Sequence, residues 1–318
     1  MTSAMPVDPM AAMRLAAEPP PLMMLGRQVH GVVSWNINDT CNYRCSYCTQ
    51  RFMPWRGKIL RGSAEVDRYL HAFAGLPGGT WEVKLSGGEP FAQPGIEDIA
   101  AGLVRLGHIV SIQTNFSAPD RRLMTFLEAT EGALHVFSAS LHLEYTKAET
   151  FIARRALLAP WIEAFGVRFN VTSVATPGRL RELHDVIAPA FAAAKISFKV
   201  QPEKQRGYVR DYTPDELALL EALGGHNHLG EVSPDFQGRL CWAGARYLVI
   251  KSSGEAFRCY PASRVGGTYA RCGSIAEGIS VLEGPRPCPY TYCNCSVPIE
   301  RGMVQGVRPR TGNLEHVE

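Results

Sequence analysis

The sequence lacks any long apolar run. Among its 318 residues, no uninterrupted apolar stretch approaches the roughly 18 residues that a membrane helix needs. The first 30 residues are rich in Met and Ala, but prolines and charged residues divide them into pieces too short for the apolar core of a signal peptide. We therefore expect a cytoplasmic protein that does not contact a membrane. In that reducing compartment, clustered cysteines hold metal more often than they form disulfides.

The sequence also lacks a strong excess of charge. Its formal net charge is +3 with a pI near 8.4, and the Lys and Arg residues are scattered rather than gathered in one run. A basic face or an added RNA-binding module is not visible, so a nucleic-acid partner is not expected. The apolar fraction of 46% can support a proper core, and the length suits one large α/β domain with an appendage.

Cysteine is absent from a long central stretch. Of nine cysteines, three lie at Cys41, Cys45 and Cys48, and the next is Cys241. The remaining six all lie between Cys241 and Cys295. Two cysteine-rich regions separated in this way indicate two metal sites around one scaffold.

From residue 31 onward, short apolar runs alternate with helix-like segments. The expected strands cover residues 31–38, 81–86, 108–114, 134–141, 167–174 and 196–201. The expected helices lie near residues 63–75, 95–106, 119–129, 147–165 and 179–194. Six β-α units with right-handed crossovers predict an α/β fold, a partial (β/α)6 TIM-like barrel with a small C-terminal cysteine-rich domain.

This alternation predicts five segments along the chain. They are a disordered N-terminal extension (1–30), the partial barrel (31–205), a linker with one helix (206–238), a cysteine-bearing domain (239–300) and a polar, poorly ordered tail (301–318).

Two short motifs directly follow the first two expected strands. The sequence CNYRCSYC (41–48) comes after the first, and GGE (87–89) comes after the second. Reactive groups in such barrels gather on loops at the carboxyl ends of the strands, so both motifs should face one mouth. A four-iron cluster needs one ligand per iron, and three thiols leave one iron for an exogenous ligand.

The pattern C-x3-C-x2-C followed by GGEP after the next strand resembles the radical S-adenosylmethionine (SAM) enzymes, over about residues 30–200. Three unrelated buried thiols or a zinc knuckle are the alternatives. The resemblance implies a [4Fe–4S] cluster on Cys41, Cys45 and Cys48, with SAM chelating the open iron. It also implies reductive cleavage of SAM to a 5′-deoxyadenosyl radical that abstracts hydrogen from a substrate.

The resemblance further implies roles around SAM. Gly87 and Gly88 would let the backbone approach its methionyl end, Glu89 would receive its ammonium, and Tyr47 would lie against the adenine. Residues at strand ends match positions where relatives hold the ribose, carboxylate or adenine: Thr114, Asn115, Ser140, Asn170 and Val171. Each of these also fits a cap or turn residue, and Tyr47 fits an ordinary packed aromatic. The family's usual Asp and downstream Arg are missing after residues 140–142, which leaves Lys147, Arg154 or Arg155 for SAM's carboxylate.

The C-terminal cysteines resemble a second family feature. Cys241 and Cys259 flank a hairpin-like segment with Gly254 at its turn, as in the auxiliary-cluster domains called SPASM and twitch. The segment CPYTYCNC adds Cys288, Cys293 and Cys295. One auxiliary [4Fe–4S] cluster fits this number, with Cys288 as the spare thiol if Cys293 and Cys295 close the site. A zinc-ribbon-like knot stays open, because spacing alone does not choose between zinc and iron–sulfur.

Cys272 stands apart from both groups. It is either a small buried thiol or a hydrogen-atom donor to a substrate radical, which would make the enzyme an epimerase of peptides or sugars.

The expected reaction is dehydrogenation or radical C–X bond formation in natural-product biosynthesis, fed by an external electron donor such as flavodoxin or ferredoxin. The substrate is a small molecule or a peptide. Only 40 residues precede Cys41, too few for the leader-binding domain that many peptide-modifying relatives carry, which favours a small molecule or a peptide captured in another way. A non-catalytic iron–sulfur or zinc protein for electron transfer or assembly is the competing hypothesis.

Overall fold

The six expected strands form a parallel sheet that curls into part of a barrel. The computed structural model describes residues 21–49, 57–205, 208–224, 227, 229, 232–293 and 295–310. Within the sheet the strand order β3-β4-β5-β6-β7-β8 follows the sequence, and every neighbouring pair is parallel. The strands are β3 (Gly31–Asn38), β4 (Trp81–Gly87), β5 (Ile109–Thr114), β6 (Leu134–Leu141), β7 (Arg168–Ala175) and β8 (Ser197–Pro202). The predicted partial barrel is confirmed.

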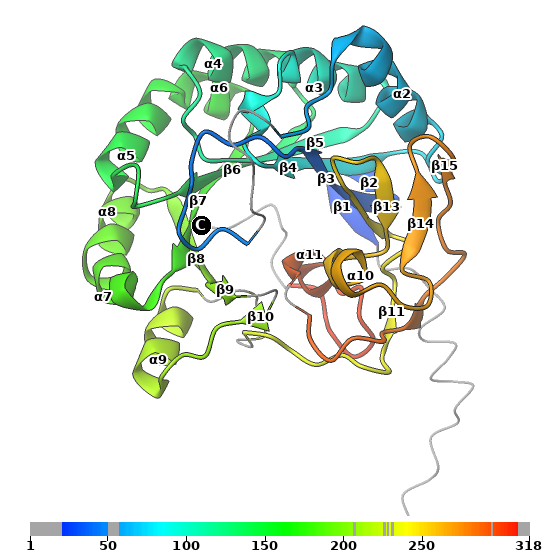
Figure 1. Cartoon of the computed structure of the whole chain (residues 1–318). Helices are drawn as coiled ribbons and strands as arrows, with labels where there is room; N and C mark the ends of the chain where they lie inside the picture. The colour runs from blue at the N-terminus through cyan, green and yellow to red at the C-terminus, as the bar shows by residue number, and fades with distance from the viewer. Residues whose placement is uncertain are drawn as a thin grey trace, which may run out of the picture.

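The helices of this barrel lie on the outer side of the strands (Figure 1). They are α2 (Gly62–Ala74), α3 (Ile96–Arg105), α4 (Asp120–Ala129), α5 (Ala148–Leu157), α6 (Ala159–Ala164), α7 (Leu180–Glu182) and α8 (Ala188–Ala193). A π-helical turn, Leu183–Ile187, joins α7 to α8, and the 3-10 turns Pro90–Ala92 and Pro177–Arg179 complete the set. The outward side chains of the strands, such as Trp35 stacked on Tyr69 of α2, form the main apolar core.

One helix was expected over residues 147–165, and the structure has two. The first ends at Leu157, and the second begins at Ala159 with Pro160 in its first turn. Proline has no backbone N–H to donate, so it is tolerated in the first turn of a helix but not in its interior. The break therefore lies at Pro160.

The C-terminal cysteine-bearing segment is not a separate layer. Its strand β12 (Tyr247–Ile250) pairs parallel with β3, Tyr247 lying opposite Val32. The predicted hairpin is present: β12 pairs antiparallel with β13 (Glu255–Phe257), and Gly254, with φ +90°, lies in the turn. With β14 (Arg271–Ser274) and β15 (Gly278–Ile279) the sheet reaches ten strands.

The remaining smaller elements follow β8 in the chain and extend across the open side of the strands (Figure 1). They are β9 (Lys204–Gln205), β10 (Tyr208–Val209), α9 (Pro214–Ala222), β11 (Leu240–Cys241), α10 (Tyr260–Val265), β16 (Arg286–Pro287) and α11 (Ser296–Glu300). None of the helices among the described residues is long and apolar enough to span a membrane.

Two expected boundaries differ from the structure. The N-terminal extension was expected to be disordered through residue 30, but β1 (Leu22–Met24) and β2 (Arg27–Val29) form an antiparallel hairpin whose Leu22, Met24 and Val29 are buried. The poorly ordered tail was expected to begin at residue 301, but Met303, Val304 and Val307 are buried. They lie in a second apolar cluster that also contains Leu22, Met24 and Val29. Apolar residues spaced through both segments supply contacts that their polar composition obscured.

A charged network closes the end of the barrel where the strands begin. Glu82 of β4 is fully buried, accepts a hydrogen bond from the Ser111 hydroxyl at 2.6 Å, lies 3.2 Å from His135, and pairs with Arg301 at 3.1 Å. Burial raises the pKa of the Glu82 carboxyl, but the Arg301 charge and the His135 contact outweigh burial and hold the pKa well below its usual range. The ion pair fixes the C-terminal segment to the barrel.

Glu82→Gln should destabilise the fold by about 3–5 kcal/mol, because Arg301 would remain as a buried charge without its partner. Urea unfolding at neutral pH measures this loss. Since the folded-state pKa is depressed, the stabilisation exists above the unfolded value near 4.5 and is lost as the pH falls below it, so the gap between wild type and variant should narrow in acid. A double variant with Arg301→Met should lose less than the sum of the single losses. Additive losses would show that the pair contributes nothing.

Candidate active site

The two motifs that follow the first two barrel strands line one cavity. It has a volume of about 560 Å³ and is lined by Cys41, Cys45 and Cys48 together with Gly87 and Gly88. Ligand sites of about 300–1,000 Å³ accommodate cofactor-sized molecules. The predicted common mouth is therefore present, and the cavity continues into the barrel past Ser111 and Ser138, which also line it.

The three thiols are electrostatic neighbours with different exposures. Cys41 is buried, Cys45 is half-buried and Cys48 is exposed. Burial, together with negative charge on Glu144, Cys48 and Cys41, raises the pKa of Cys45 to about 12. Three adjacent thiols can all ionise only if a cation compensates their charge, and iron in a cluster supplies that. The donor set therefore fits the expected cluster.

No group of three His, Cys, Asp or Glu residues in the described part of the chain converges on a single ion. A cubane binds each thiolate at a different iron, so its ligands need not converge on one point.

The loop after β6 supports the cysteine loop. Glu144 accepts a hydrogen bond from the Ser46 backbone N–H at 2.9 Å and another from its hydroxyl, and the Tyr145 hydroxyl accepts one from the Arg44 N–H at 2.7 Å. The ring of Tyr145 stacks on Tyr43 with centroids 4.2 Å apart. These residues belong to the segment that departs from the family pattern in the sequence. The sequence indicated only that this segment departs from the family pattern. It did not indicate that the segment holds the cysteine loop.

Tyr47 lines the same cavity beside His142. Its hydroxyl lies 2.9 Å from Nδ1 of His142, and the two rings stack 5.9 Å apart. Burial lowers the pKa of His142 to about 4, so this imidazole is neutral at physiological pH. The placement is compatible with an aromatic wall for adenine, which stays a prediction.

Glu144→Gln should loosen the cysteine loop without removing any ligand. The amide has one acceptor oxygen in place of two, so one of the two hydrogen bonds to Ser46 is lost, at a cost of about 0.5–1.5 kcal/mol. We expect cluster iron to be released to a chelator roughly twofold to tenfold faster, measured by absorbance. Glu149→Gln, an exposed carboxylate in the first turn of α5, is the matched control. Equal release rates in both variants would contradict this role for Glu144.

Gly87 and Gly88 lie against the chain that leads into the cysteine loop. Gly87 has φ +134°, and a Cβ there would lie 2.5 Å from the Asn38 carbonyl oxygen. A Cβ on Gly88 would lie 2.0 Å from the Thr40 carbonyl oxygen, immediately before Cys41. Backbone approach to SAM was the expected reason for these glycines. The structure shows that close packing of β4 against the end of β3 also requires glycine here, and the approach to SAM stays a prediction.

Glu89 was expected to receive the ammonium of SAM, but its carboxylate is already engaged. It is buried and accepts hydrogen bonds from the Thr114 hydroxyl at 2.6 Å, the Asn115 N–H at 2.7 Å and the Phe91 N–H at 3.0 Å. Burial raises the pKa of this carboxyl, and the three donors oppose that rise. The carboxylate does not line the cavity, so its observed role is to join the GGE loop to the end of β5.

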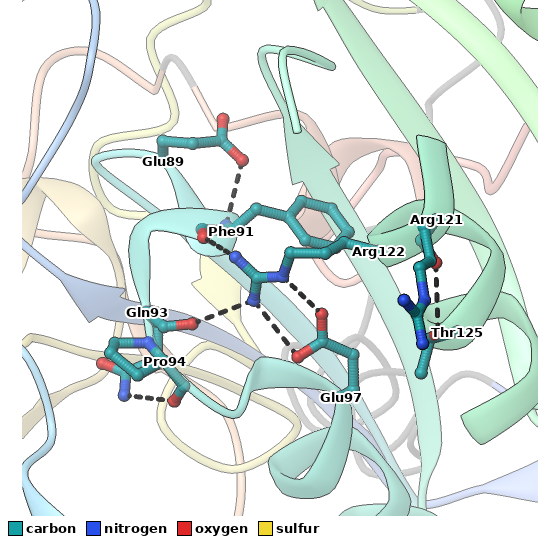
Figure 2. Close-up of polar contacts among 8 residues, drawn as sticks. All are labelled: Glu89, Phe91, Gln93, Pro94, Glu97, Arg121, Arg122 and Thr125. Atoms are coloured by element: carbon teal, nitrogen blue, oxygen red, sulfur yellow. Dashed lines mark hydrogen bonds and ion pairs between the residues drawn. The ribbon is translucent and has the colours of Figure 1, made fainter. Parts of the chain in front are cut away.

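Arg122 of α4 fixes the turn that follows Glu89. Figure 2 shows its guanidinium donating to the Phe91 carbonyl at 2.6 Å and to the Glu97 carboxylate at 2.8 and 3.1 Å. Two neighbouring outer helices thus hold the GGE loop from behind. The loop is rigid because its backbone and its buried carboxylate both have partners.

The other predicted SAM contacts divide into two groups. Thr114, Asn115, Ser140 and Asn170 line the cavity. The side chain of Val171 does not, because alternation along β7 directs it into the apolar core. Any contact from that position would come through its backbone.

None of the three cations proposed for the SAM carboxylate lines the cavity. Arg154 donates to Asp120 at 2.6 Å and to the Phe116 and Ala118 carbonyls, and Arg155 lies 3.4 Å from Glu163. Lys147 is the N-cap of α5 and is exposed. The cations that do line the cavity come from the barrel interior and the C-terminal segment.

The C-terminal cysteines line a second cavity. It is bounded by Cys241, Cys259, Cys288, Cys293 and Cys295, with Arg258 beside them. The pKa of Cys293 is raised chiefly by burial and also by negative charge on Cys295, Cys241 and Cys259. These four thiols are therefore neighbours. The charged neighbours of Cys288 are Arg258 and Asp235, and Cys288 in turn acts on Cys241.

Cys272 lines neither cavity. It lies on β14, is buried in the main apolar core, and burial raises its pKa to about 11. The geometry favours a packed thiol over a hydrogen donor at the active site.

Comparison of the sequence with known proteins gives partial matches. Residues 35–166 match the model of the radical SAM superfamily. A GTP 3′,8-cyclase of Stenotrophomonas maltophilia is 34% identical over 119 residues, 36% of each chain. A SAM-dependent nucleotide dehydratase of Psychrobacter lutiphocae is 37% identical over 46 residues, 14% of this chain and 15% of the other. The matched segments thus span about a third or less of these relatives.

Comparison of folds extends further along the chain. The structure of Streptococcus suis SuiB bound to SAM is similar with a TM-score of 0.55 and 16% identity, over 78% of this chain and 64% of that one. The structure of anSMEcpe with SAM and a peptide gives a TM-score of 0.51 and 15% identity over 77% of each chain. These similarities concern the fold alone. The shared fold is consistent with the match of residues 35–166 to the radical SAM model. Residues 35–166 of the chain therefore form a radical SAM domain.

Proposed function

We propose that this chain binds a [4Fe–4S] cluster through Cys41, Cys45 and Cys48 and binds SAM in the adjoining cavity. The observation that carries the proposal is the shared lining of one 560 Å³ cavity by the three thiols and the GGE loop. When bound, the cluster and SAM supply a primary-carbon radical that abstracts hydrogen from a substrate.

In this proposal the protein positions its cofactors and excludes water. The loop of His142, Glu144 and Tyr145 holds the cysteine loop, and the Glu89 carboxylate holds the GGE loop against β5. Asn38 Oδ1 is buried without a hydrogen-bond partner among the described residues, and it would lie 2.9 Å from a Cβ on Gly88. A buried acceptor without a partner is satisfied when a bound ligand brings a hydrogen-bond donor to it, so this oxygen supports the proposal of a ligand here.

We further propose one auxiliary [4Fe–4S] cluster on Cys241, Cys259, Cys293 and Cys295, with Cys288 spare. The electrostatic influence of Cys295, Cys241 and Cys259 on Cys293 supports the assignment. The reaction would be dehydrogenation or C–X bond formation, with electrons from a flavodoxin or ferredoxin. A peptide substrate is the second candidate, because SuiB, which shares the fold, has been solved with its precursor peptide SuiA.

Anaerobic reconstitution tests the proposed function. Protein supplied with iron, sulfide, SAM and dithionite should form 5′-deoxyadenosine, measured by chromatography against a sample without dithionite. Absence of 5′-deoxyadenosine from protein with full iron content would contradict the proposal and favour a non-catalytic iron–sulfur protein.

A further inference from the structure

The interior of the barrel is lined by polar side chains. Alternate residues point inward on each strand, and on β8 they are Ser197, Lys199 and Gln201. On β4, Lys84 and Ser86 line the same cavity. Barrels of this size usually fill their interior with apolar side chains. A polar interior around a cavity therefore indicates a site for a polar ligand.

The cavity carries many more cations than anions. Among the residues that the structure describes, its lining includes one carboxylate, Glu300, against these Lys and Arg residues: Lys84, Arg168, Lys199, Lys204, Arg264, Arg301 and Arg310. Arg301 is neutralised by Glu82 beneath the cavity. The remaining excess of positive charge gives the cavity a strong attraction for anions, because a cleft with low-dielectric walls focuses the field.

The side-chain ammonium groups of Lys84 and Lys199 form no hydrogen bond and no ion pair within 4 Å with the residues that the structure describes, although the charge of Lys84 lowers the pKa of Glu82. Burial lowers the pKa of Lys199; Glu300 raises it in part, and the charges of Lys84, Arg310 and Arg168 lower it further. Like charges held together inside a protein are costly without a counter-charge. A bound anion would supply that counter-charge.

SAM does not account for these lysines. It carries one carboxylate against a sulfonium and an ammonium, so its net charge is positive. Lys84 precedes Gly87 by three residues along β4, which places it about 10 Å further into the barrel than the GGE loop at about 3.3 Å per residue. The lysines therefore face the part of the cavity beyond the cluster.

We propose that Lys84 and Lys199, flanked by Arg168, bind a multiply charged anionic group of the substrate, a phosphate or a polycarboxylate. The inference that the bound anion belongs to the substrate rests on the proposed function. The charged group would anchor the substrate deep in the barrel and leave its reacting carbon toward the cluster end.

Equilibrium dialysis of the reconstituted holoprotein at low ionic strength tests the site. The probes are radiolabelled inorganic phosphate and radiolabelled succinate, which carry similar charge at pH 8. Lys84→Gln and Lys199→Gln should each weaken binding at least tenfold, and the double variant should show no saturable binding. Lys195→Gln, which removes an exposed lysine from the loop before β8, should bind as the wild type does. Preference for phosphate would indicate a phosphate ester, and preference for succinate a polycarboxylate.

Wild-type binding no tighter than that of the double variant would overturn the anion site. The same wild-type preparation is assayed for 5′-deoxyadenosine, which separates the two claims. SAM cleavage without anion binding would remove the anion site and keep the proposed function. Saturable anion binding that the lysine variants lose, without SAM cleavage, would keep the site and remove the proposed function.

Discussion

Replacing Cys45 by alanine is expected to abolish SAM cleavage. Cys45 is one of the three N-terminal thiols that line the main cavity, and its pKa is raised by burial and by negative charge on Glu144 and on the other two thiols. Loss of residues that merely orient metal ligands typically costs 10–100-fold in metal affinity or activity, so loss of a ligand should exceed about a hundredfold. The rate of 5′-deoxyadenosine formation and the iron content of the anaerobic protein measure the effect.

Cys272→Ala is the matched control for that experiment. It also removes a thiol, but one that lies in the apolar core and lines neither cavity. We expect a modest loss of stability and normal iron content. If Cys45→Ala and Cys272→Ala lowered the iron content equally, the N-terminal thiols would have no special role.

Gly88→Ala should have the second largest effect. Its Cβ would lie 2.0 Å from the Thr40 carbonyl oxygen and 2.5 Å from the Thr40 carbonyl carbon, so the backbone just before Cys41 has to move. Overpacking of this kind costs about 1–3 kcal/mol, and a displacement near 1 Å at a reaction centre can cost about a hundredfold in rate. We expect 5′-deoxyadenosine formation to fall by about that factor while the iron content falls less.

Gly284→Ala provides the comparison, because a Cβ there meets nothing within 4 Å. Its rate should equal that of the wild type. A Gly88→Ala protein that cleaves SAM as fast as Gly284→Ala does would show that the β3 end can move without consequence for the site.

The fold was largely predictable because its strands are short, apolar and bounded by turn residues. The expected ranges 31–38 and 134–141 coincide with β3 and β6. The pairing of β12 with β3 was not predictable, because it joins residues more than 200 positions apart and no local pattern indicates such a contact. The hairpin at residues 22–29 was missed because each strand covers only three residues and the exposed Met23 removes any apolar–polar alternation from the first strand.

The candidate site was predictable where the motif itself forms it. The three thiols and Gly87 and Gly88 do line one cavity. Roles that depend on the neighbours of a side chain were not predictable. The carboxylate of Glu89 faces Thr114 rather than the cavity, and Arg154 pairs with Asp120. Lys84 and Lys199 were missed because they lie within strands. From sequence alone a lysine in a strand is expected to face solvent, and only the structure shows which face of each strand points into the barrel.

The central claim is that the three N-terminal thiols leave one iron of their cluster open for SAM. Mössbauer spectroscopy of protein reconstituted with 57Fe, recorded with and without SAM, tests it most directly. We predict that one iron of this cluster changes its isomer shift and quadrupole splitting when SAM is added, and that Cys45→Ala lacks this component. Identical spectra with and without SAM, from protein that contains the N-terminal cluster, would contradict the claim.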